Sequence, residues 1–513
     1  MPPELQTILI IAVVILAVLS PFYWRTIRKG AEDSKTNRQL SKAAKSARMG
    51  QKPYGESANA AMGGAYFLTP SQLMEKGYVF PEDNTAPFDK RLSLGYVRNP
   101  QNKEEISLLF TAPQGHIITV APTRTGKGTC HIIPNLLDYT GSVIVNDIKG
   151  ENYAITHKRR IEHGAVYKFS PFDDHSHGWN PIQEIVELDD EEDQWEAARL
   201  MADMLIVSTE KGNSFWEDEA RNLLTAIILF VVLNNPEDGQ TMSEVRHYST
   251  QSESGMAEFV QERLQSHENS ALRRAGNVFG AADSKVKSGI ISTLNSQMGI
   301  WDSRKLEQAM SKSDFTFKSI KEKSGSSLYF ILPFEKLQTY RPVMRLFFGM
   351  AINALTKGKN PDNKPDTVLF LDEFPQLGHM KPIENGISFI AGYGCRLWLF
   401  AQDLKQIEKH YSREGAATML GNCATRCFFT PNDMDTADYL SNLHGDMTVT
   451  VEGSKDNFSY SKQPLMLPQE LMGNMNREYQ QAVFFQGEMP VTSGREPYYE
   501  NPRYSGYYET WEG

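Results

Sequence analysis

The stretch Ala121–Thr129, with the sequence Ala-Pro-Thr-Arg-Thr-Gly-Lys-Gly-Thr, decides how the rest of the chain is interpreted. It overlaps the end of the apolar run His116–Ala121, which predicts a buried parallel strand, and it precedes a predicted helix, His131–Leu137. In a phosphate-binding loop between a strand and a helix, backbone amides surround the phosphates and a lysine reaches the outer ones. Lys127 holds the position of that lysine. The predicted phosphate-binding residues are Pro122, Thr123, Arg124, Thr125, Gly126, Lys127, Gly128 and Thr129.

The loop departs from the usual pattern at two positions. Ala121 stands where the first glycine is expected, and Gly128 stands where a serine or threonine would contact magnesium. Thr129 follows one position late, and the sequence leaves open whether it replaces that ligand. The alternative interpretation is an ordinary glycine-containing turn between a strand and a helix.

A second signal lies at the end of the fully apolar run Thr367–Leu371, where Asp372 and Glu373 follow directly. In phosphoryl-transfer sites the first carboxylate of such a pair helps to hold Mg²⁺, and the second orients and deprotonates the attacking water. Acidic residues also favour the start of a helix, so a helix cap is the alternative. Gln402, just after the run Arg396–Phe400, is a third candidate, either as a sensor of the outer phosphate or as a surface glutamine.

The remaining chain has the rhythm of an α/β fold. Helical periodicity dominates from about residue 181 to 317, which predicts an all-helical insertion between strands. The stretch from about Ser493 to Gly513 is rich in Tyr, Glu, Pro and Gly, and it therefore predicts a flexible tail. Further short apolar runs predict strands at Ser142–Val145, Tyr167–Phe169, Ser327–Leu332, Arg396–Phe400, Arg426–Phe429 and Gln481–Phe485.

The N-terminal segment predicts a membrane anchor. Leu5–Trp24 carries no charge, and a helix of this length, about 30 Å, is long enough to cross a bilayer. A cleaved signal peptide and a buried core helix are the alternatives, but a signal peptide begins with basic residues and this chain does not. Nine basic and two acidic residues follow between Arg25 and Lys52, so the positive-inside rule places this flank in the cytoplasm. The flank is a linker attracted to anionic lipid or, alternatively, a nucleic-acid contact.

The charge of the chain is unevenly distributed. The overall value of −10 excludes a broad basic surface that coats nucleic acid. With Glu4 included, residues 1–52 carry a net +6, so the rest of the chain carries −16. This distribution is compatible with a narrow basic channel inside an acidic outer face. Four cysteines are too few for a disulfide framework, which favours a reducing, cytosolic environment for the main body.

Several blocks of sequence occur in the order found in one protein family. They are Ala121–Gly128, Val143–Glu151, Phe169–Ile182, Phe215–Leu224, Lys287–Thr293, Phe370–Gly378, Ala391–Leu404 and Leu420–Asn422. Through them the chain resembles the type IV secretion system coupling proteins (TraG/TraD-like), the membrane-anchored ATPases of conjugative DNA transfer and effector export. The resemblance runs from about Phe110 to Gln486. A glycine after the loop lysine also occurs in this family.

The resemblance implies an α/β fold: a RecA-like P-loop NTPase motor domain with an inserted all-α domain, working as a homo-hexamer. It implies ATP and Mg²⁺ as cofactors. Lys127, Glu373 and Gln402 are then the catalytic residues, and Asp372 and Thr129 lie at the metal bound with the nucleotide.

In such rings an arginine from the neighbouring subunit stabilises the charge of the transition state. Arg396 and Arg426, at the starts of two late strands, are the candidates, with a structural ion pair as the alternative for each. Asp147, Lys149 and Glu151 match a family block at the end of the second strand, without a role that one sequence can assign.

The expected organisation has six parts. These are a membrane anchor (1–24), a basic juxtamembrane linker (25–60), the first part of the nucleotide-binding domain (61–180), the all-α insertion (181–317), the second part of the nucleotide-binding domain (318–492) and the flexible tail (493–513). The family usually has two membrane helices, whereas this sequence shows one. Either the protein is a single-span member or a helix upstream is missing, and in both cases the expected location is the bacterial inner membrane with the bulk cytoplasmic.

Three functions remain open from the sequence. The first, which we favour, is an ATPase that pumps single-stranded DNA with its attached relaxase, delivered as a relaxosome, into the type IV secretion channel during conjugation. The second is a coupling ATPase that exports protein effectors without DNA, which the acidic body favours. The third is a receptor that binds ATP only for assembly and uses its helical domain as an adaptor.

Overall fold

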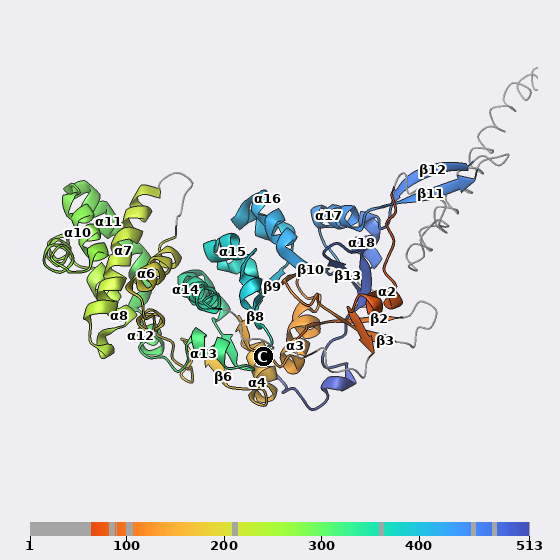
Figure 1. Ribbon diagram of the computed structural model, residues 1–513, viewed down its shortest axis with the longest axis horizontal. Helices are drawn as coiled ribbons and strands as arrows, with labels where there is room; N and C mark the ends of the chain where they lie inside the picture. Colours follow the sequence, from red (N-terminus) through yellow and green to blue (C-terminus); the bar gives the residue numbers. More distant parts are fainter. Residues whose placement is uncertain are drawn as a thin grey trace, which may run out of the picture.

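The computed structural model describes residues 63–81, 88, 90–98, 106–207, 214–358, 364–452, 458–474 and 480–511. A twelve-stranded sheet runs through these residues in the order β1-β3-β2-β14-β13-β10-β4-β9-β8-β5-β7-β6 (Figure 1). The strands are β1 (Val79–Pro81), β2 (Ser93–Arg98), β3 (Ile106–Phe110), β4 (His116–Val120), β5 (Val143–Asn146), β6 (Val166–Phe169), β7 (Ser327–Phe330), β8 (Thr367–Leu371), β9 (Cys395–Ala401), β10 (Cys423–Phe428), β13 (Gln480–Phe485) and β14 (Val491–Gly494).

The half of the sheet from β10 to β6 is parallel throughout. Its central strands β4, β5, β7, β8 and β9 are buried along their whole length. Strands covered on both faces read as continuous apolar runs, which is why the sequence predicts them. Every predicted strand is present, and the expected α/β fold with a mostly parallel sheet is confirmed.

The other half of the sheet is antiparallel, from β13 through β14 and β2 to β3 and β1. The sequence does not predict β1, β2, β3 or β14. They are short, and each mixes buried residues with partly or fully exposed ones, so they lack a continuous buried apolar run. A separate hairpin of β11 (Asp446–Glu452) and β12 (Phe458–Pro464) projects from this end of the molecule (Figure 1).

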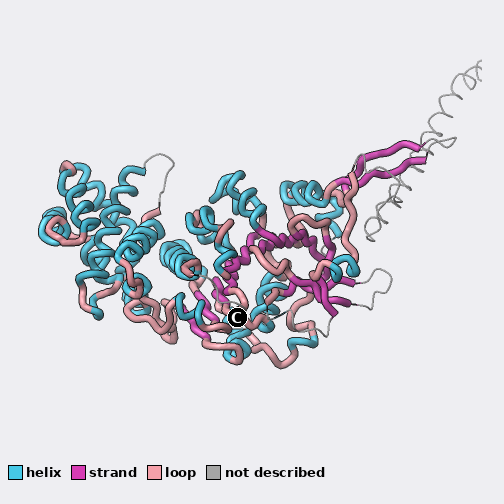
Figure 2. The backbone as a smooth tube through the Cα atoms, viewed as in Figure 1, coloured by secondary structure: helices cyan, strands magenta, loops and turns pink. Residues whose placement is uncertain are grey.

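Helices cover both faces of the parallel half, and Figure 2 shows the strands as one continuous layer among them. Side chains of α14, α15 and α16 pack with Ile118 and Ile144 on one face, while Leu136 and Tyr139, within and just after α3, pack with Ile117 and Val143 on the other. The helices of this α/β part are α2 (Pro70–Glu75), α3 (Ile133–Asp138), α4 (Glu151–Ile161), α14 (Leu337–Leu355), α15 (Lys381–Gly386), α16 (Leu404–Asn422), α17 (Met434–His444) and α18 (Pro468–Asn474).

An all-helical segment connects β6 to β7 and forms one end of the molecule (Figure 1). Polar caps start its helices: the Asp190 side chain accepts from Glu192 N, and the Asp283 side chain accepts from Val286 N. The helices are α5 (Gln183–Val186), α6 (Glu191–Leu205), α7 (Ser214–Asn234), α8 (Met242–Ser249), α9 (Glu253–Phe259), α10 (Ser270–Ala281), α11 (Ser284–Met298), α12 (Arg304–Ala309) and α13 (Phe317–Glu322).

The predicted membrane anchor (1–24) and basic linker (25–60) lie outside the described residues. Within the part of the chain that is described, none of the helices combines the length and apolar character that a membrane span requires. The prediction of a flexible tail is wrong for residues 493–511, which pack on the α/β part. Tyr498 and Tyr504 are buried there, and Arg503 pairs with Asp138 at the end of α3. The composition of this segment suggested disorder. The residues that hold it in place lie hundreds of positions earlier in the sequence, so local composition does not show them.

Candidate phosphate-binding site

The loop after β4 has the conformation of a tight, glycine-dependent turn. Ala121 N still donates to Ala401 O of β9, and the Thr125 hydroxyl then donates to Pro122 O at 2.6 Å. Gly126 has a φ of +87°, and a Cβ on it would lie 3.2 Å from Cys130 Sγ and Thr129 Oγ1. The backbone conformation therefore favours glycine at this position, and the space for a Cβ is tight.

A π turn, η2 (Gly128–Ile132), joins the loop to α3. Ile133 N donates to Gly128 O, and Cys130 N donates to Gly126 O at 2.8 Å. Single π turns inside helices are frequent at functional sites. Pro134 lies in the first turn of α3, where its missing N–H is tolerated. The loop and this turn place the Lys127 side chain at the carboxyl end of the parallel sheet.

The acidic pair after β8 faces Lys127 directly. The Lys127 ammonium lies 3.1 Å from Asp372 Oδ1 and forms an ion pair with Glu373 Oε1. Glu373 has a φ of +51°, a left-handed conformation that is costly for a residue with a side chain and is concentrated at functional sites. Gln402, after β9, donates from Nε2 to Glu373 Oε2 at 3.0 Å. The structure thus brings together all four residues that three separate signals in the sequence suggested.

Sheet topology explains this convergence. The neighbouring strands β4, β9, β8 and β5 are parallel, so their carboxyl ends meet at one edge of the sheet. Lys127 follows the first, Gln402 the second, and Asp372 with Glu373 the third. Asn146, the last residue of β5, donates from Nδ2 to Asp372 O at 2.6 Å and supports the turn that carries the acidic pair.

The site is a partly buried cluster in which opposite charges compensate one another. Burial lowers the pKa of Lys127, but the carboxylates of Asp372 and Glu373 more than offset this, so the pKa is raised and the ammonium stays charged. Burial raises the pKa of Asp372, against the opposing effect of Lys127. Asp147, after β5, is more strongly affected: burial raises its pKa to about 7, although it accepts a hydrogen bond from Tyr153 N. A cationic side chain thus lies among carboxylates whose charge the protein interior disfavours.

The donor set fits a magnesium ion that is bound together with a nucleotide. Asp372 offers carboxylate oxygens, and Mg²⁺ is typically held by one or two carboxylates plus substrate phosphates. The Thr129 hydroxyl lies on the phosphate-binding loop, two residues after Lys127, and donates to Gly126 O at 3.3 Å. Among the described residues no group of three or more His, Cys, Asp or Glu is arranged to hold a metal by itself. Phosphate oxygens would therefore have to complete the coordination.

Arg396 does not fit the role of an arginine that reaches a neighbouring subunit. It lies at the opposite, amino edge of the sheet and is fully buried. Its guanidinium donates to Gly115 O at 2.9 Å and to Ala112 O at 3.0 Å. The prediction of a trans-acting role for Arg396 is therefore wrong, because the side chain links backbone carbonyls inside the subunit.

Arg426 is different. It lies in β10, paired with Ile118 of β4, and is only partly buried. Its side chain lines a groove between α16 and α17 together with Lys405, Glu408 and Asp435. The groove opens to the surface, so the Arg426 side chain borders solvent, whereas the Arg396 side chain is enclosed within the subunit.

Two supporting residues were not predicted as site residues. Asn146 lies inside the family block Val143–Glu151, so the sequence did contain a signal for it. Arg495 donates from Nη1 to Thr125 O in the loop. It lies in the segment with the composition of a flexible tail, which carries no signal for such a contact.

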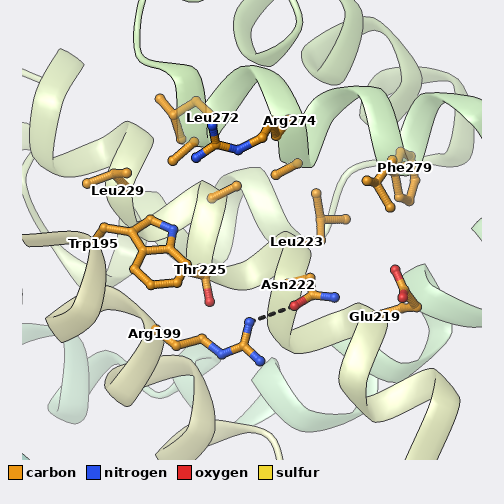
Figure 3. A pocket seen from close by; sticks show the side chains of 14 residues that line it. Trp195, Arg199, Glu219, Asn222, Leu223, Thr225, Leu229, Leu272, Arg274 and Phe279 are labelled. Atoms are coloured by element: carbon orange, nitrogen blue, oxygen red, sulfur yellow. Dashed lines mark hydrogen bonds between the residues drawn. The ribbon is translucent and has the colours of Figure 1, made fainter. Parts of the chain in front are cut away.

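A pocket in the all-helical segment lies far from the Lys127 site. Trp195 and Arg199 of α6, Asn222 of α7 and Arg274 of α10 line it, with apolar side chains between them (Figure 3). Arg199 donates to Asn222 Oδ1 at 2.6 Å. The pocket lacks the paired carboxylates and the glycine loop of the site at the sheet edge.

Sequence comparison places the chain in a family. Residues 71–509 match the family described as Type IV secretory system Conjugative DNA transfer. The chain belongs to this family. Among proteins of known name, it is 30% identical over 410 residues to Protein VirD4 of Agrobacterium fabrum, covering 77% of this chain and 60% of that protein. It is 27% identical over 457 residues to Conjugal transfer protein TraG of Escherichia coli, covering 80% of this chain and 71% of that protein.

The conjugative transfer family also accounts for the fold. The unbound structure of the bacterial conjugative coupling protein TrwBdeltaN70 superimposes with a TM-score of 0.62, at 15% identity, over 84% of this chain and 93% of that chain. TrwB in complex with the ATP analogue ADPNP superimposes with a TM-score of 0.58, at 17% identity, over 74% of this chain and 85% of that chain. The chain spans about 60% of the length of the VirD4 proteins that it matches.

Proposed function

We propose that this protein is an ATP hydrolase that drives single-stranded DNA, with an attached relaxase, into a type IV secretion channel during conjugation. The observation that carries the proposal is the cluster of Lys127, Asp372, Glu373 and Gln402 at one edge of the parallel sheet. Membership of the conjugative transfer family supports the DNA substrate. The nucleotides named for TrwB, an ATP analogue and ADP with Mg²⁺, support ATP and magnesium as cofactors.

In the proposed mechanism the loop Pro122–Thr129 surrounds the phosphates, the backbone amides after Pro122 donate to them, and Lys127 contacts the outer ones. Asp372 and Thr129 would hold the magnesium that is bound with the nucleotide, and that ion would supply neutralisation of phosphate charge. Glu373 orients the attacking water and takes its proton. Gln402 holds the Glu373 carboxylate by a 3.0 Å hydrogen bond, and this contact supports its proposed role as a sensor of the outer phosphate.

We further propose that six copies form a ring and that Arg426 acts on the nucleotide of the neighbouring subunit. Its partly buried position in the groove between α16 and α17 supports this assignment over Arg396. A positive charge from a second subunit stabilises the transition state and links hydrolysis to ring assembly. The remaining proposed partners are the channel proteins and the relaxosome, and the proposed location is the inner membrane, through one N-terminal span with the bulk cytoplasmic.

Steady-state ATP turnover of the full chain, with and without single-stranded DNA, tests the function. We expect Lys127→Ala to abolish turnover, while circular dichroism and thermal unfolding remain close to those of the wild type. Turnover that survives this substitution would contradict the motor function. Stimulation by single-stranded DNA supports DNA transfer, whereas stimulation only by secreted proteins would favour the effector-export alternative, for which the acidic body of the chain is the argument.

A mixing experiment tests the ring. Lys127→Ala and Arg426→Ala subunits are each expected to be inactive alone. If Arg426 acts in trans, a mixed ring contains interfaces with both residues intact, and part of the turnover returns on mixing. A mixture as inactive as its components would place Arg426 outside the trans site.

A further inference from the structure

The last described segment of the chain runs back across the phosphate-binding loop and the two helices behind it. After β14, Arg495 contacts Thr125 of the loop, and Tyr498 N donates to Thr129 O at 2.9 Å. The Tyr504 hydroxyl then donates to Asp138, and Glu509 N donates to Ile155 O of α4 at 3.0 Å. Figure 1 shows the end of this segment beside α4, which lies in the first third of the sequence.

Arg495 is the member of this segment that touches the loop itself. Its side chain is 1% exposed, and its guanidinium lies 3.8 Å from the centre of the Phe429 ring. Nη1 donates to Thr125 O and would lie 3.4 Å from a Cβ on Gly126. The guanidinium is thus fixed by an aromatic face and held against the peptide that joins Thr125 to Gly126.

The direction of this contact matters for phosphate binding. In a trans peptide the C=O and the following N–H point in opposite directions. Because Thr125 O points to Arg495, the N–H of Gly126 points away from it. Glycine at a φ of +87° allows a peptide to turn over more easily than any other residue, so the loop alone does not fix this orientation.

We propose that Arg495 is a positioning residue for nucleotide binding: it holds the Thr125–Gly126 peptide so that the Gly126 amide is oriented to donate to a phosphate. This inference rests on the proposed function of the loop. Arg503, eight residues later, forms a paired ion contact with Asp138 at 3.0–3.2 Å without touching the loop. It provides a matched control for the attachment of the whole segment.

Three variants of the full chain test the proposal, with binding of a fluorescent ATP analogue, KM, kcat and thermal unfolding as readouts. Arg495→Met keeps an apolar side chain on Phe429 and removes the donor. We expect it to raise Kd and KM about tenfold, as for the loss of one hydrogen bond with a charged donor, with a smaller change in kcat. Arg495→Lys, which restores a charged donor, should recover most of the affinity. Arg503→Gln should lower Tm and leave Kd near that of the wild type.

Two outcomes would overturn the proposal: an unchanged Kd for Arg495→Met, or an equal rise for Arg503→Gln, which would show that the segment acts only as a brace. If Arg495→Met does not fold, Phe429→Leu removes the ring under the guanidinium, and a Kd equal to that of the wild type would then count against the proposal. Lys127→Ala separates a failure of the Arg495 proposal from a failure of the proposed function of the loop. If this variant binds the analogue as tightly as the wild type, the proposed function of the loop fails as well.

Discussion

Both edges of the parallel sheet hold charged side chains, which are partly buried at the carboxyl edge and fully buried at the amino edge. At the carboxyl edge, Lys127, Asp372 and Glu373 contact one another through their side chains. At the amino edge, Arg396 and Arg160 donate to backbone carbonyls, and Arg160 alone contacts Tyr139 O, Gly141 O and Gly325 O. Carbonyl groups are fixed by the fold, whereas side-chain ion pairs can exchange partners. The first arrangement is suited to binding a charged ligand, and the second to joining strands.

His116 shows the same character at the amino edge. Its Nδ1 accepts from Leu397 N at 3.0 Å, so Nε2 carries the proton that it donates to Ile387 O at 2.8 Å. Burial lowers its pKa to about 4, which keeps the ring neutral at physiological pH. Substitutions at the carboxyl edge should therefore change turnover more than stability, and substitutions at the amino edge should do the reverse.

The largest effect is expected for Glu373→Gln. The amide keeps the shape of the side chain but cannot take a proton, so we expect turnover to fall by about 10²- to 10⁴-fold, as for the loss of a general base. Binding of an ATP analogue should persist, measured by fluorescence titration. Turnover equal to that of the wild type would place the base on another residue and weaken the contrast between the edges.

Arg396→Met should have the next largest effect, on stability. It leaves the carbonyls of Gly115 and Ala112 without their buried donor, and we expect a loss of about 3 kcal/mol in the free energy of unfolding. Urea unfolding measures this change. Turnover per folded molecule should stay the same. If turnover were lost while stability was kept, Arg396 would belong to the chemistry after all.

Asp147→Asn should change how stability depends on pH. The pKa of Asp147 is raised from 3.8 to about 7, so between these values the folded protein binds more protons than the unfolded chain. The stability of the wild type therefore falls with rising pH in this window, by at most about 1.4 kcal/mol per pH unit from this group. Asparagine removes the titration, and the variant should gain stability relative to the wild type from pH 5 to pH 7. Urea unfolding at pH 5 and pH 7 measures the free energy of unfolding of both proteins. An equal difference between wild type and variant at the two pH values would refute the raised pKa of Asp147.

Gln402→Ala should have the smallest effect of the four. It removes the single hydrogen bond to Glu373 Oε2, so we expect about a tenfold loss in kcat with little change in the affinity for nucleotide. Thermal unfolding should remain within the range of the wild type. A loss as large as that of Glu373→Gln would mean that Gln402 contacts the reacting groups and does more than position the carboxylate.

The sequence predicted the part of the fold that is buried on both faces. β4, β8 and β9 are buried and largely apolar, and the loops that follow them carry Lys127, Asp372 with Glu373, and Gln402 to one edge. The antiparallel strands β1, β2 and β3 escaped prediction because each is short and mixes buried residues with partly or fully exposed ones. The pattern of apolar residues along a segment predicts a strand when the strand is buried on both faces. Where a strand is only partly buried, this pattern is weak.

Arginines show where sequence reasoning stops. Arg396 and Arg426 looked equivalent, since each stands near the start of a late strand, but one is enclosed and the other lines an open groove. Arg495 gave no signal at all, because its partners Thr125 and Phe429 are distant in the chain. The role of such an arginine depends on which distant segments of the chain contact one another in the fold.

The π turn after Lys127 accounts for the unusual sequence of the loop, in which Gly128 separates Lys127 from Thr129. In a π turn each hydrogen bond spans one residue more than in an α-helix, so the turn can absorb a single added residue without disturbing the helix that follows. Without Gly128 the chain would read Gly-Lys-Thr, as the common pattern does. A Cβ at Gly128 would meet nothing within 4 Å, so neither space nor conformation demands a glycine there. The widened turn thus accommodates Gly128 between Lys127 and Thr129, and the helix that follows begins as it would after a loop without this residue.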